Sequence, residues 1–279
     1  MNQSEKTKAL IKNYAQLNNV SSQEVLQIYL FERFLERLSV SKYRDNFALK
    51  GGLLISSLIG VNQRTTQDLD ATVLNLKMDE NTISNIVAQI TSIPIRDDVI
   101  FNYNRIESIR QKDDYNNFRV HLSAMMGKIN ASLKIDITTG DALTPSAIEY
   151  IYTTLLDSKH IEIKAYNLET LLAEKFETIL CRNVATTRIR DYYDLYMLFR
   201  TRKSSINSKT MKLAVLNTAN HRNTEHIVSD WEKICIELKN DESIYQLWKN
   251  YQNHFYFAAN ISFDEVIGNL FEFGEFIGI

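Results

Sequence analysis

Three aspartates have the spacing and sequence context of a site for divalent cations. Asp68 and Asp70 are separated by one residue at the start of a predicted strand, and Asp136 lies between two isoleucines in another. Residues i and i+2 of a strand point to one face and lie roughly 6.6–7 Å apart, so Asp68 and Asp70 could share two Mg²⁺ ions spaced about 3.5–4 Å. Carboxylate oxygens favour Mg²⁺ or Mn²⁺ over zinc. The sequence therefore predicts a magnesium site in which Asp136 is the third carboxylate.

A glycine pair, Gly51-Gly52, follows Lys50 where a predicted strand turns into a helix. Glycine lets backbone N–H groups approach a phosphate closely, and a helix N-terminus favours an anion. The pair is not a Walker loop, because no Gly-Lys-Ser/Thr sequence follows it. Arg64, four residues before Asp68, adds a positive charge. We interpret Lys50, Gly51, Gly52 and Arg64 as candidate nucleotide-binding residues.

Each of these features has a simpler explanation when taken alone. A glycine pair usually forms only a turn, and an Asp-x-Asp sequence is more often a solvated strand edge. Aspartate is disfavoured in strands, however, and here three aspartates occur in apolar strand contexts. The combination therefore favours the catalytic interpretation over the structural one.

A second group of charges occurs in helical sequence, in Leu-Ala-Glu-Lys ending at Lys175 and Arg-Ile-Arg-Asp-Tyr-Tyr-Asp-Leu-Tyr ending at Tyr196. Lys175 and Arg182 are seven residues apart and share one helix face, while Asp191 and Asp194 share another by the i, i+3 rule. These four charges could meet across a helix pair, where Lys175 and Arg182 would be further candidate nucleotide-binding residues. An ordinary network of interhelical ion pairs stays open as the alternative.

Periodicity and capping signals predict the elements that position these residues. Two helices open the chain, and the second is marked by Ser21 and Glu24, the spacing of a capping box. We then predict a strand at 47–49, a helix ending near 59, a strand at 69–74, a helix at 79–90, extended segments at 99–109, 118–126 and 129–137, and a weak strand at 160–164. The three extended segments should form an antiparallel meander. Asn167 should cap a series of helices at 168–182, 188–203, 208–220, 224–239, 243–257 and 263–276.

These elements predict an α+β protein in two parts. Residues 1–165 should form an α/β domain with a mixed or antiparallel sheet flanked by helices, and residues 166–279 an all-helical bundle. With 279 residues, of which 44% are hydrophobic, the chain can build two sizeable cores. No stretch approaches membrane-spanning length, the N-terminus lacks an apolar leader, and Cys181 and Cys235 look like buried, inert thiols. We therefore expect a cytoplasmic protein with no membrane partner.

The net charge of −2 conceals an uneven distribution of charge. From Arg182 to Lys212 there are eight basic residues and two acids, whereas from Glu225 to the C-terminus there are three lysines and ten acids. The basic segment could hold a triphosphate or an RNA backbone, and the acidic end could not. The alternative, which applies to most charge runs, is a solvated helix face.

The order of these motifs resembles a known superfamily. A strand, a glycine pair and a helix, then Arg-x-Thr-x-Asp-x-Asp and Ile-Asp-Ile, are similar to the polymerase-beta-like nucleotidyltransferases. The motifs at Lys175 and Asp191 resemble, more narrowly, the abortive-infection nucleotidyltransferase toxins of the AbiEii/AbiGii toxin family. The resemblance extends from about Phe47 to Phe199.

The resemblance implies the toxin of a toxin–antitoxin system used in phage defence. Such a toxin would transfer a nucleotide from a magnesium-bound nucleoside triphosphate (NTP) to an acceptor, the 3′ end of tRNA, and a cognate antitoxin is an implied partner. The implied roles are a phosphate-binding turn for Gly51 and Gly52, metal ligands for Asp68, Asp70 and Asp136, a triphosphate contact for Lys175, and positioning of that lysine or of the attacking hydroxyl for Asp191 and Asp194. The site is then expected between the two halves of the chain, where the three acids would face Lys175.

One position departs from the family pattern and keeps other functions open. Leu53 stands where the family commonly has a hydroxyl residue, so backbone donors or Ser56 would have to replace that phosphate contact. One alternative is transfer to a protein side chain or a small molecule such as an antibiotic. The other is a non-catalytic module that binds a nucleotide or a partner protein.

Overall fold

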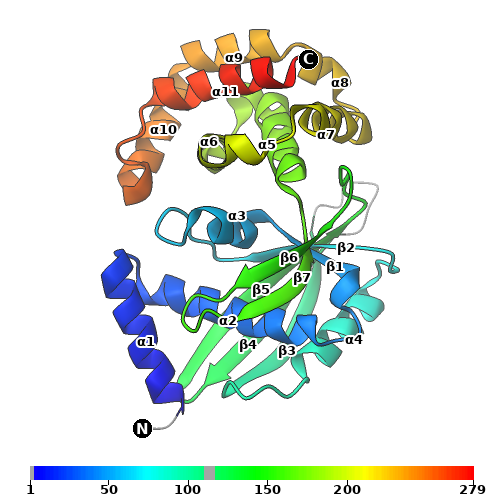
Figure 1. The fold of residues 1–279 in the computed structure, drawn as a ribbon, viewed down its shortest axis with the longest axis vertical. Coiled ribbons are helices and arrows are strands. Elements are labelled where there is room, and N and C mark those ends of the chain that lie inside the picture. The colour runs from blue at the N-terminus through cyan, green and yellow to red at the C-terminus, as the bar shows by residue number, and fades with distance from the viewer. Residues whose placement is uncertain (1–2, 110–116) are drawn as a thin grey trace. The chain divides into compact units, whose positions relative to one another are not determined.

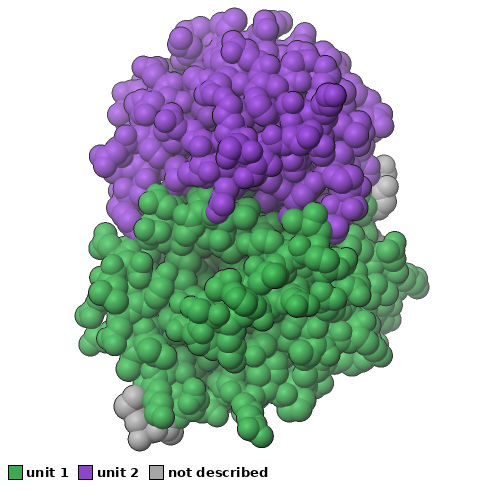
Figure 2. Space-filling model, viewed as in Figure 1, with its two compact units in different colours: residues 1–140, 148–165 green, residues 141–147, 166–279 purple. Residues whose placement is uncertain are grey.

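A computed structural model describes residues 3–109 and 117–279 of the chain (Figure 1). They form two compact units, one of residues 1–140 and 148–165 and the other of residues 141–147 and 166–279 (Figure 2). Unit 1 combines a sheet with helices and unit 2 is helical, so the predicted α+β class is confirmed. Within the described ranges, no helix has both the length and the apolar composition that crossing a bilayer requires.

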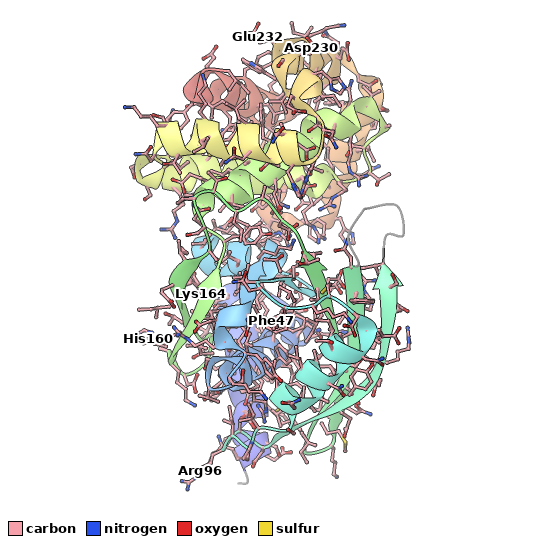
Figure 3. The ribbon with its side chains drawn as sticks, turned by 90° about the vertical axis from the view of Figure 1, so that its right-hand side faces the viewer. Phe47, Arg96, His160, Lys164, Asp230 and Glu232 are labelled. Atoms are coloured by element: carbon pink, nitrogen blue, oxygen red, sulfur yellow. The ribbon has the colours of Figure 1, made fainter. Side chains whose placement is uncertain are left out.

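The strands of unit 1 form one mixed sheet of seven strands among the described residues, in the order β3-β4-β5-β2-β1-β7-β6. Their bounds are β1 Phe47–Lys50, β2 Leu69–Val73, β3 Val99–Ile109, β4 Asn117–Met126, β5 Ile129–Thr139, β6 Ile148–Thr153 and β7 His160–Ala165. The pairs β2–β5 and β1–β7 are parallel and the others antiparallel. The predicted β3-β4-β5 meander is confirmed; the segment predicted as the turn between β3 and β4 falls largely outside the described residues. Phe47 on β1 and Lys164 on β7, both labelled in Figure 3, lie on neighbouring strands.

Strand β6 was not predicted, and its position in the sheet explains why. Among the described strands it lies at the edge and pairs with β7 alone, and of its side chains only that of Tyr152 is buried. Its exposed residues include Ile148 and Ile151, which obscure the alternation that normally identifies a strand.

The helices of unit 1 begin and end close to the predicted residues. They are α1 Gln3–Asn18, α2 Ser22–Ser39, α3 Gly51–Ile59 and α4 Glu80–Thr91. The capping box is present at α2, where Ser21 Oγ accepts the Glu24 N–H at 3.1 Å and the Glu24 carboxylate accepts the Ser21 N–H at 3.0 Å. Asp79 caps α4 by accepting the Thr82 N–H at 3.0 Å.

The two faces of the central strands carry different chemistry. Leu49, Leu69 and Ile135 project toward the apolar side chains of α2 and line the core with them. Because side chains alternate along a strand, Asp70 and Asp136 point to the opposite face. In β5, Ile135 and Ile137 are buried while Asp136 between them is partly exposed. One sheet face therefore builds the core and the other carries the acids.

Unit 2 is built around α5, which contacts α6, α7, α8 and α9. Its helices are α5 Leu168–Arg182, α6 Ile189–Arg202, α7 Ser208–His221, α8 Glu225–Ser229, α9 Trp231–Asn240, α10 Glu242–His254 and α11 Phe263–Ile277. Asn167 caps α5, as predicted, by accepting the Thr170 N–H at 3.0 Å. The prediction of one helix over 224–239 is wrong, because the chain leaves helical geometry at Asp230 and buries Trp231 at the start of α9.

The segment 141–147 belongs to unit 2 because Thr144 is bound to its helices. The Thr144 carbonyl accepts from the Asn167 side chain at 2.6 Å, and its N–H donates to Thr170 Oγ1 at 3.1 Å. Asn217 on α7 donates to Thr144 Oγ1 at 3.0 Å. These bonds satisfy the buried polar atoms of a segment that belongs to no strand or helix and so lacks regular backbone partners.

The two cysteines are poor nucleophiles. Cys235 is buried, as predicted, whereas Cys181 is only partly buried and lies 3.1 Å from Glu177 Oε1. Burial raises the pKa of both thiols to about 12, and Glu177 adds to the effect at Cys181. Because the thiolate is the nucleophile, a pKa this high leaves very little reactive form at neutral pH. This supports the prediction of unreactive thiols, whereas the predicted burial is incomplete at Cys181.

Candidate active site

The glycine pair and Asp70 form one close-packed turn in unit 1. Gly51 has a φ of +62°, and a Cβ at this position would lie 2.2 Å from Asp70 Oδ2. The Gly52 N–H donates to the same oxygen at 3.3 Å. Only glycine combines this backbone conformation with so close a neighbour. Position 51 therefore requires glycine, because the Asp70 carboxylate lies against the first turn of α3.

Gly52 is required for a second close approach. A Cβ on Gly52 would lie 2.5 Å from Thr66 Oγ1 and 3.3 Å from Arg64 Nη2. Thr66 in turn donates to the Asp68 carbonyl at 3.0 Å, a bond within the loop that leads into β2. Thr66 was not singled out in the sequence, although it is the Thr of the Arg-x-Thr-x-Asp-x-Asp motif.

Arg64 lies beside this turn but is not a surface cation. Its side chain is buried, with the residue only 4% exposed, and it donates to the Thr65 carbonyl. The predicted nucleotide-binding residue is thus adjacent to Gly52, as expected. In this conformation its guanidinium braces the loop that carries Thr66 and Asp68.

The register of the sheet places five charged residues in one row across neighbouring strands. Lys50 pairs with Asp70, and Asp70 with Asp136. Asp136 pairs with Arg119, and Arg119 with Glu107. Adjacent strands are about 4.8 Å apart, so Asp70 and Asp136 come together as the sequence predicted.

Asp70 is the acid most strongly affected by this arrangement. Burial raises its pKa, and the negative charges of Asp136 and Asp68 raise it further. The Lys50 ammonium and the Gly52 N–H oppose these effects by stabilising the carboxylate. Asp70 therefore lies where negative charge accumulates, and added positive charge would stabilise it.

Arg119 is a residue of this site that the sequence analysis missed. Its Nε donates to Asp136 Oδ1 and its Nη2 to Asp136 Oδ2, both at 2.7 Å. These bonds raise the pKa of Arg119 above its ordinary value. The sequence contained a signal for this contact, because a two-residue turn at 127–128 pairs Met126 with Ile129, and the same register places Arg119 opposite Asp136.

The donor set fits a hard divalent cation in part. Asp70 lies on β2 and Asp68 directly precedes this strand, so the prediction that both lie within one strand is wrong for Asp68. Both offer carboxylate oxygens, which suit Mg²⁺ or Mn²⁺, and the charge of Asp68 acts on Asp70. Both oxygens of Asp136 accept from Arg119, so this acid can become a ligand only if the guanidinium releases it. Consistent with this, no three acidic, histidine or cysteine side chains in the described parts of the chain are grouped to hold a metal ion.

The charged motif of unit 2 forms a compact cluster between α5 and α6. Lys175 Nζ lies 2.5 Å from Asp191 Oδ1 and 2.9 Å from Asp194 Oδ2. Arg188 Nε lies 2.8 Å from the other oxygen of Asp191. Both acids are buried, and the lysine is mostly buried. The predicted meeting of Lys175, Asp191 and Asp194 is seen in the structure, while their alignment with the acids of unit 1 stays a prediction.

Several other residues that were predicted to contact nucleotide or RNA have different surroundings in the structure. Arg182 is exposed, and among the described residues it forms no ion pair with Asp191 or Asp194. In the basic segment, Lys203 pairs with Glu272 at 2.5 Å. Leu53 is fully buried in the core, and Ser56 is only 2% exposed. Backbone N–H groups at the start of α3 are therefore better placed to contact a phosphate than the Ser56 hydroxyl.

A mixed sheet with a glycine-pair turn at a helix start and acids on two neighbouring strands defines a nucleotidyltransferase-type fold. The family model described as nucleotidyl transferase AbiEii toxin, type IV toxin–antitoxin system, matches residues 33–269. The chain belongs to this family of nucleotidyltransferase toxins. The match includes the glycine pair, the Asp68–Asp70 motif and the Lys175 cluster. No curated protein matches the chain.

Three solved structures are similar to the chain at low sequence identity. A Helicobacter pylori protein proposed to be a nucleotidyltransferase is 18% identical, with a TM-score of 0.49, over 92% of this chain and 96% of its own. JHP933, also from Helicobacter pylori, is 18% identical with a TM-score of 0.47, over 92% of both chains. An antigenic nucleotidyltransferase-like protein from Paracoccidioides brasiliensis is 16% identical with a TM-score of 0.41, over 72% of this chain and 91% of its own. The assignment rests on the family match and the sheet, not on these likenesses.

Proposed function

We propose that the protein is a toxin that transfers a nucleotide from a magnesium-bound NTP to an acceptor hydroxyl, the 3′ end of tRNA, in a phage-defence system. The observation that carries this proposal is the row of charges that brings Asp70 beside Asp136, with the Gly52 N–H on the Asp70 carboxylate. Acids held at the N-terminus of a helix suit chemistry on a polyphosphate, which needs both oxygen ligands for a cation and N–H donors.

The residues of unit 1 have distinct proposed roles. Asp68 and Asp70 would hold Mg²⁺ or Mn²⁺, which when bound neutralises negative charge on the triphosphate. The backbone at Gly51 would contact phosphate oxygens, as would the Gly52 N–H if it exchanged its bond to Asp70 for one to a phosphate. The Lys50 ammonium would add charge next to Asp70. Because the helix start and the sheet fix these groups, they can stabilise developing charge without reorganising.

The proposed reaction forms one bond and breaks one. The acceptor hydroxyl oxygen bonds to the α-phosphorus, the bond from that phosphorus to the oxygen bridging to the β-phosphate breaks, and pyrophosphate leaves with the electron pair. The hydroxyl proton passes to a base. Positioning of the two substrates supplies much of the rate in such displacements.

In unit 2, Lys175 is the proposed contact to the triphosphate. Its ammonium donates to Asp191 Oδ1 and Asp194 Oδ2, and these two bonds limit the orientations that the side chain can take. The eight basic residues between Arg182 and Lys212 support RNA as the acceptor, because clustered positive charge attracts a nucleic-acid backbone. A cytoplasmic location, where NTP and tRNA occur, and a cognate antitoxin follow from the same proposal.

The test is incubation of the full chain with Mg²⁺, total RNA and each of the four α-labelled NTPs in turn. The expected result is one labelled product that ribonuclease destroys and protease leaves intact. A product destroyed only by protease would replace RNA with a protein acceptor. If none of the four nucleotides releases pyrophosphate, either with total RNA or with whole lysate as the source of acceptor, catalysis is refuted and a binding module is favoured.

A further inference from the structure

Arg119 and Asp136 form a two-pronged ion pair on the acid-bearing face of the sheet. The two residues lie directly opposite each other on β4 and β5. Two parallel bonds of 2.7 Å join the guanidinium to both carboxylate oxygens. The side chains are 28% and 16% exposed, so the pair is shielded from full solvation. A two-pronged, charge-assisted contact of this kind is among the stronger polar interactions in proteins.

The charges around Arg119 favour its position beside Asp136. Besides Asp136, the negative charges of Asp68 and Glu107 act on its guanidinium. On the other side of Asp136 lies Asp70, and beyond it Lys50. Arg119 thus occupies both oxygens of Asp136, which a divalent ion would otherwise bind.

The geometry points to Arg119 as a competitor of the divalent cation for Asp136. With Arg119 in place, Asp136 cannot offer an oxygen to a metal ion, and the cation is held by Asp68 and Asp70 alone. Release of Arg119 adds the third carboxylate and strengthens binding of the cation. Arg119 is therefore a positioning residue, since it acts through Asp136. This inference rests on the proposed function only in taking the cation to be Mg²⁺ or Mn²⁺.

Direct Mn²⁺ binding to the full chain, measured by loss of the electron paramagnetic resonance signal of free Mn²⁺ without nucleotide or RNA, tests this inference. Arg119→Gln should raise the apparent Mn²⁺ affinity by at least about tenfold, which corresponds to ~1.4 kcal/mol. Arg96→Gln is the control, because Arg96 is an exposed arginine of unit 1, labelled in Figure 3. It should bind Mn²⁺ as the wild type does.

Two further variants separate competition from a simple loss of charge. Arg119→Lys keeps the positive charge but cannot form the two-pronged contact, so it should raise the affinity at least about threefold. Arg119→Gln combined with Asp136→Asn removes a pair of zero net charge and should bind Mn²⁺ within about threefold of the wild type. Circular dichroism spectra matching the wild type establish that each variant is folded.

Three results would overturn the inference. One is equal Mn²⁺ affinity in the wild type and Arg119→Gln, including the case in which neither binds. Another is an Arg119→Lys variant that binds as the wild type does, because only the charge would then matter. The third is a double variant that binds at least tenfold more weakly than the wild type, because Asp136 would then already be a ligand. Nucleotide transfer plays no part in these measurements, so failure of the proposed function would be recognised separately.

Discussion

Replacement of Gly51 by alanine should destabilise the protein far more than the same change at a glycine without a close neighbour. Gly51 has a φ of +62°, and its added Cβ would lie 2.2 Å from Asp70 Oδ2 and 2.6 Å from Asp70 Cγ. The positive φ costs about 1–2 kcal/mol for a residue with a Cβ, and forcing a methyl group into packed surroundings costs about 1–3 kcal/mol more. The expected loss in free energy of unfolding is thus about 2–5 kcal/mol.

Gly278 supplies the matched control. It has the same φ of +62°, but no atom lies within 4 Å of its added Cβ. Gly278→Ala should therefore show only the backbone cost of about 1–2 kcal/mol. Urea unfolding followed by circular dichroism measures both variants.

A double substitution identifies the source of the difference. In an Asp70→Ala background the two nearest contacts of the Gly51 Cβ disappear, so Gly51→Ala should cost at least about 1 kcal/mol less than in the wild type. The reasoning is refuted if Gly51→Ala lowers the free energy of unfolding no more than Gly278→Ala does. It is also refuted if Gly51→Ala costs the same in the Asp70→Ala background as in the wild type.

Three further substitutions test other parts of the structure by urea unfolding. Asp194→Asn removes a fully buried partner of Lys175 and should cost about 3 kcal/mol, whereas Glu272→Gln, in an exposed pair with Lys203, should cost under ~1 kcal/mol; equal effects would contradict the buried cluster. Burial raises the pKa of Glu32 from 4.5 to about 8, so the folded state binds the extra proton and stability falls as pH rises through that interval. Glu32→Gln should flatten this fall, and an unchanged slope would be inconsistent with the raised pKa. Ser21→Ala should cost about 1 kcal/mol through loss of the cap, and a cost near zero would show that the cap is dispensable.

Local features of the fold were predictable because their signals lie close together in the sequence. Ser21 and Glu24 mark the start of α2, Asp79 that of α4 and Asn167 that of α5, each through a side chain that bonds to a nearby N–H. Residues 224–239 contain no glycine or proline, so they were wrongly predicted as one helix. The turn at Asp230 depends on burial of Trp231, which the local sequence does not reveal.

The site depends on pairings that short-range patterns do not contain. Asp70 and Asp136 were recognisable as acids in apolar strands, but their adjacency requires β2 and β5 to pair, although these residues lie 66 positions apart in the sequence. Arg119 could have been placed from the register of the β4–β5 hairpin. The contact of Gly51 with Asp70 could not, because it depends on the exact path of the turn into α3.

The most direct test of the proposed chemistry is the rate of label transfer from NTP to RNA by Asp70→Asn compared with Asp45→Asn. Asp45 is the control because it is an exposed acid of unit 1 that lies before the start of β1. Asp70 lies instead beside Lys50, the last residue of β1. Asp70→Asn should lower the rate by at least about a hundredfold, with Asp45→Asn close to the wild type. Equal rates for the two variants would contradict a catalytic role for the Asp70 carboxylate.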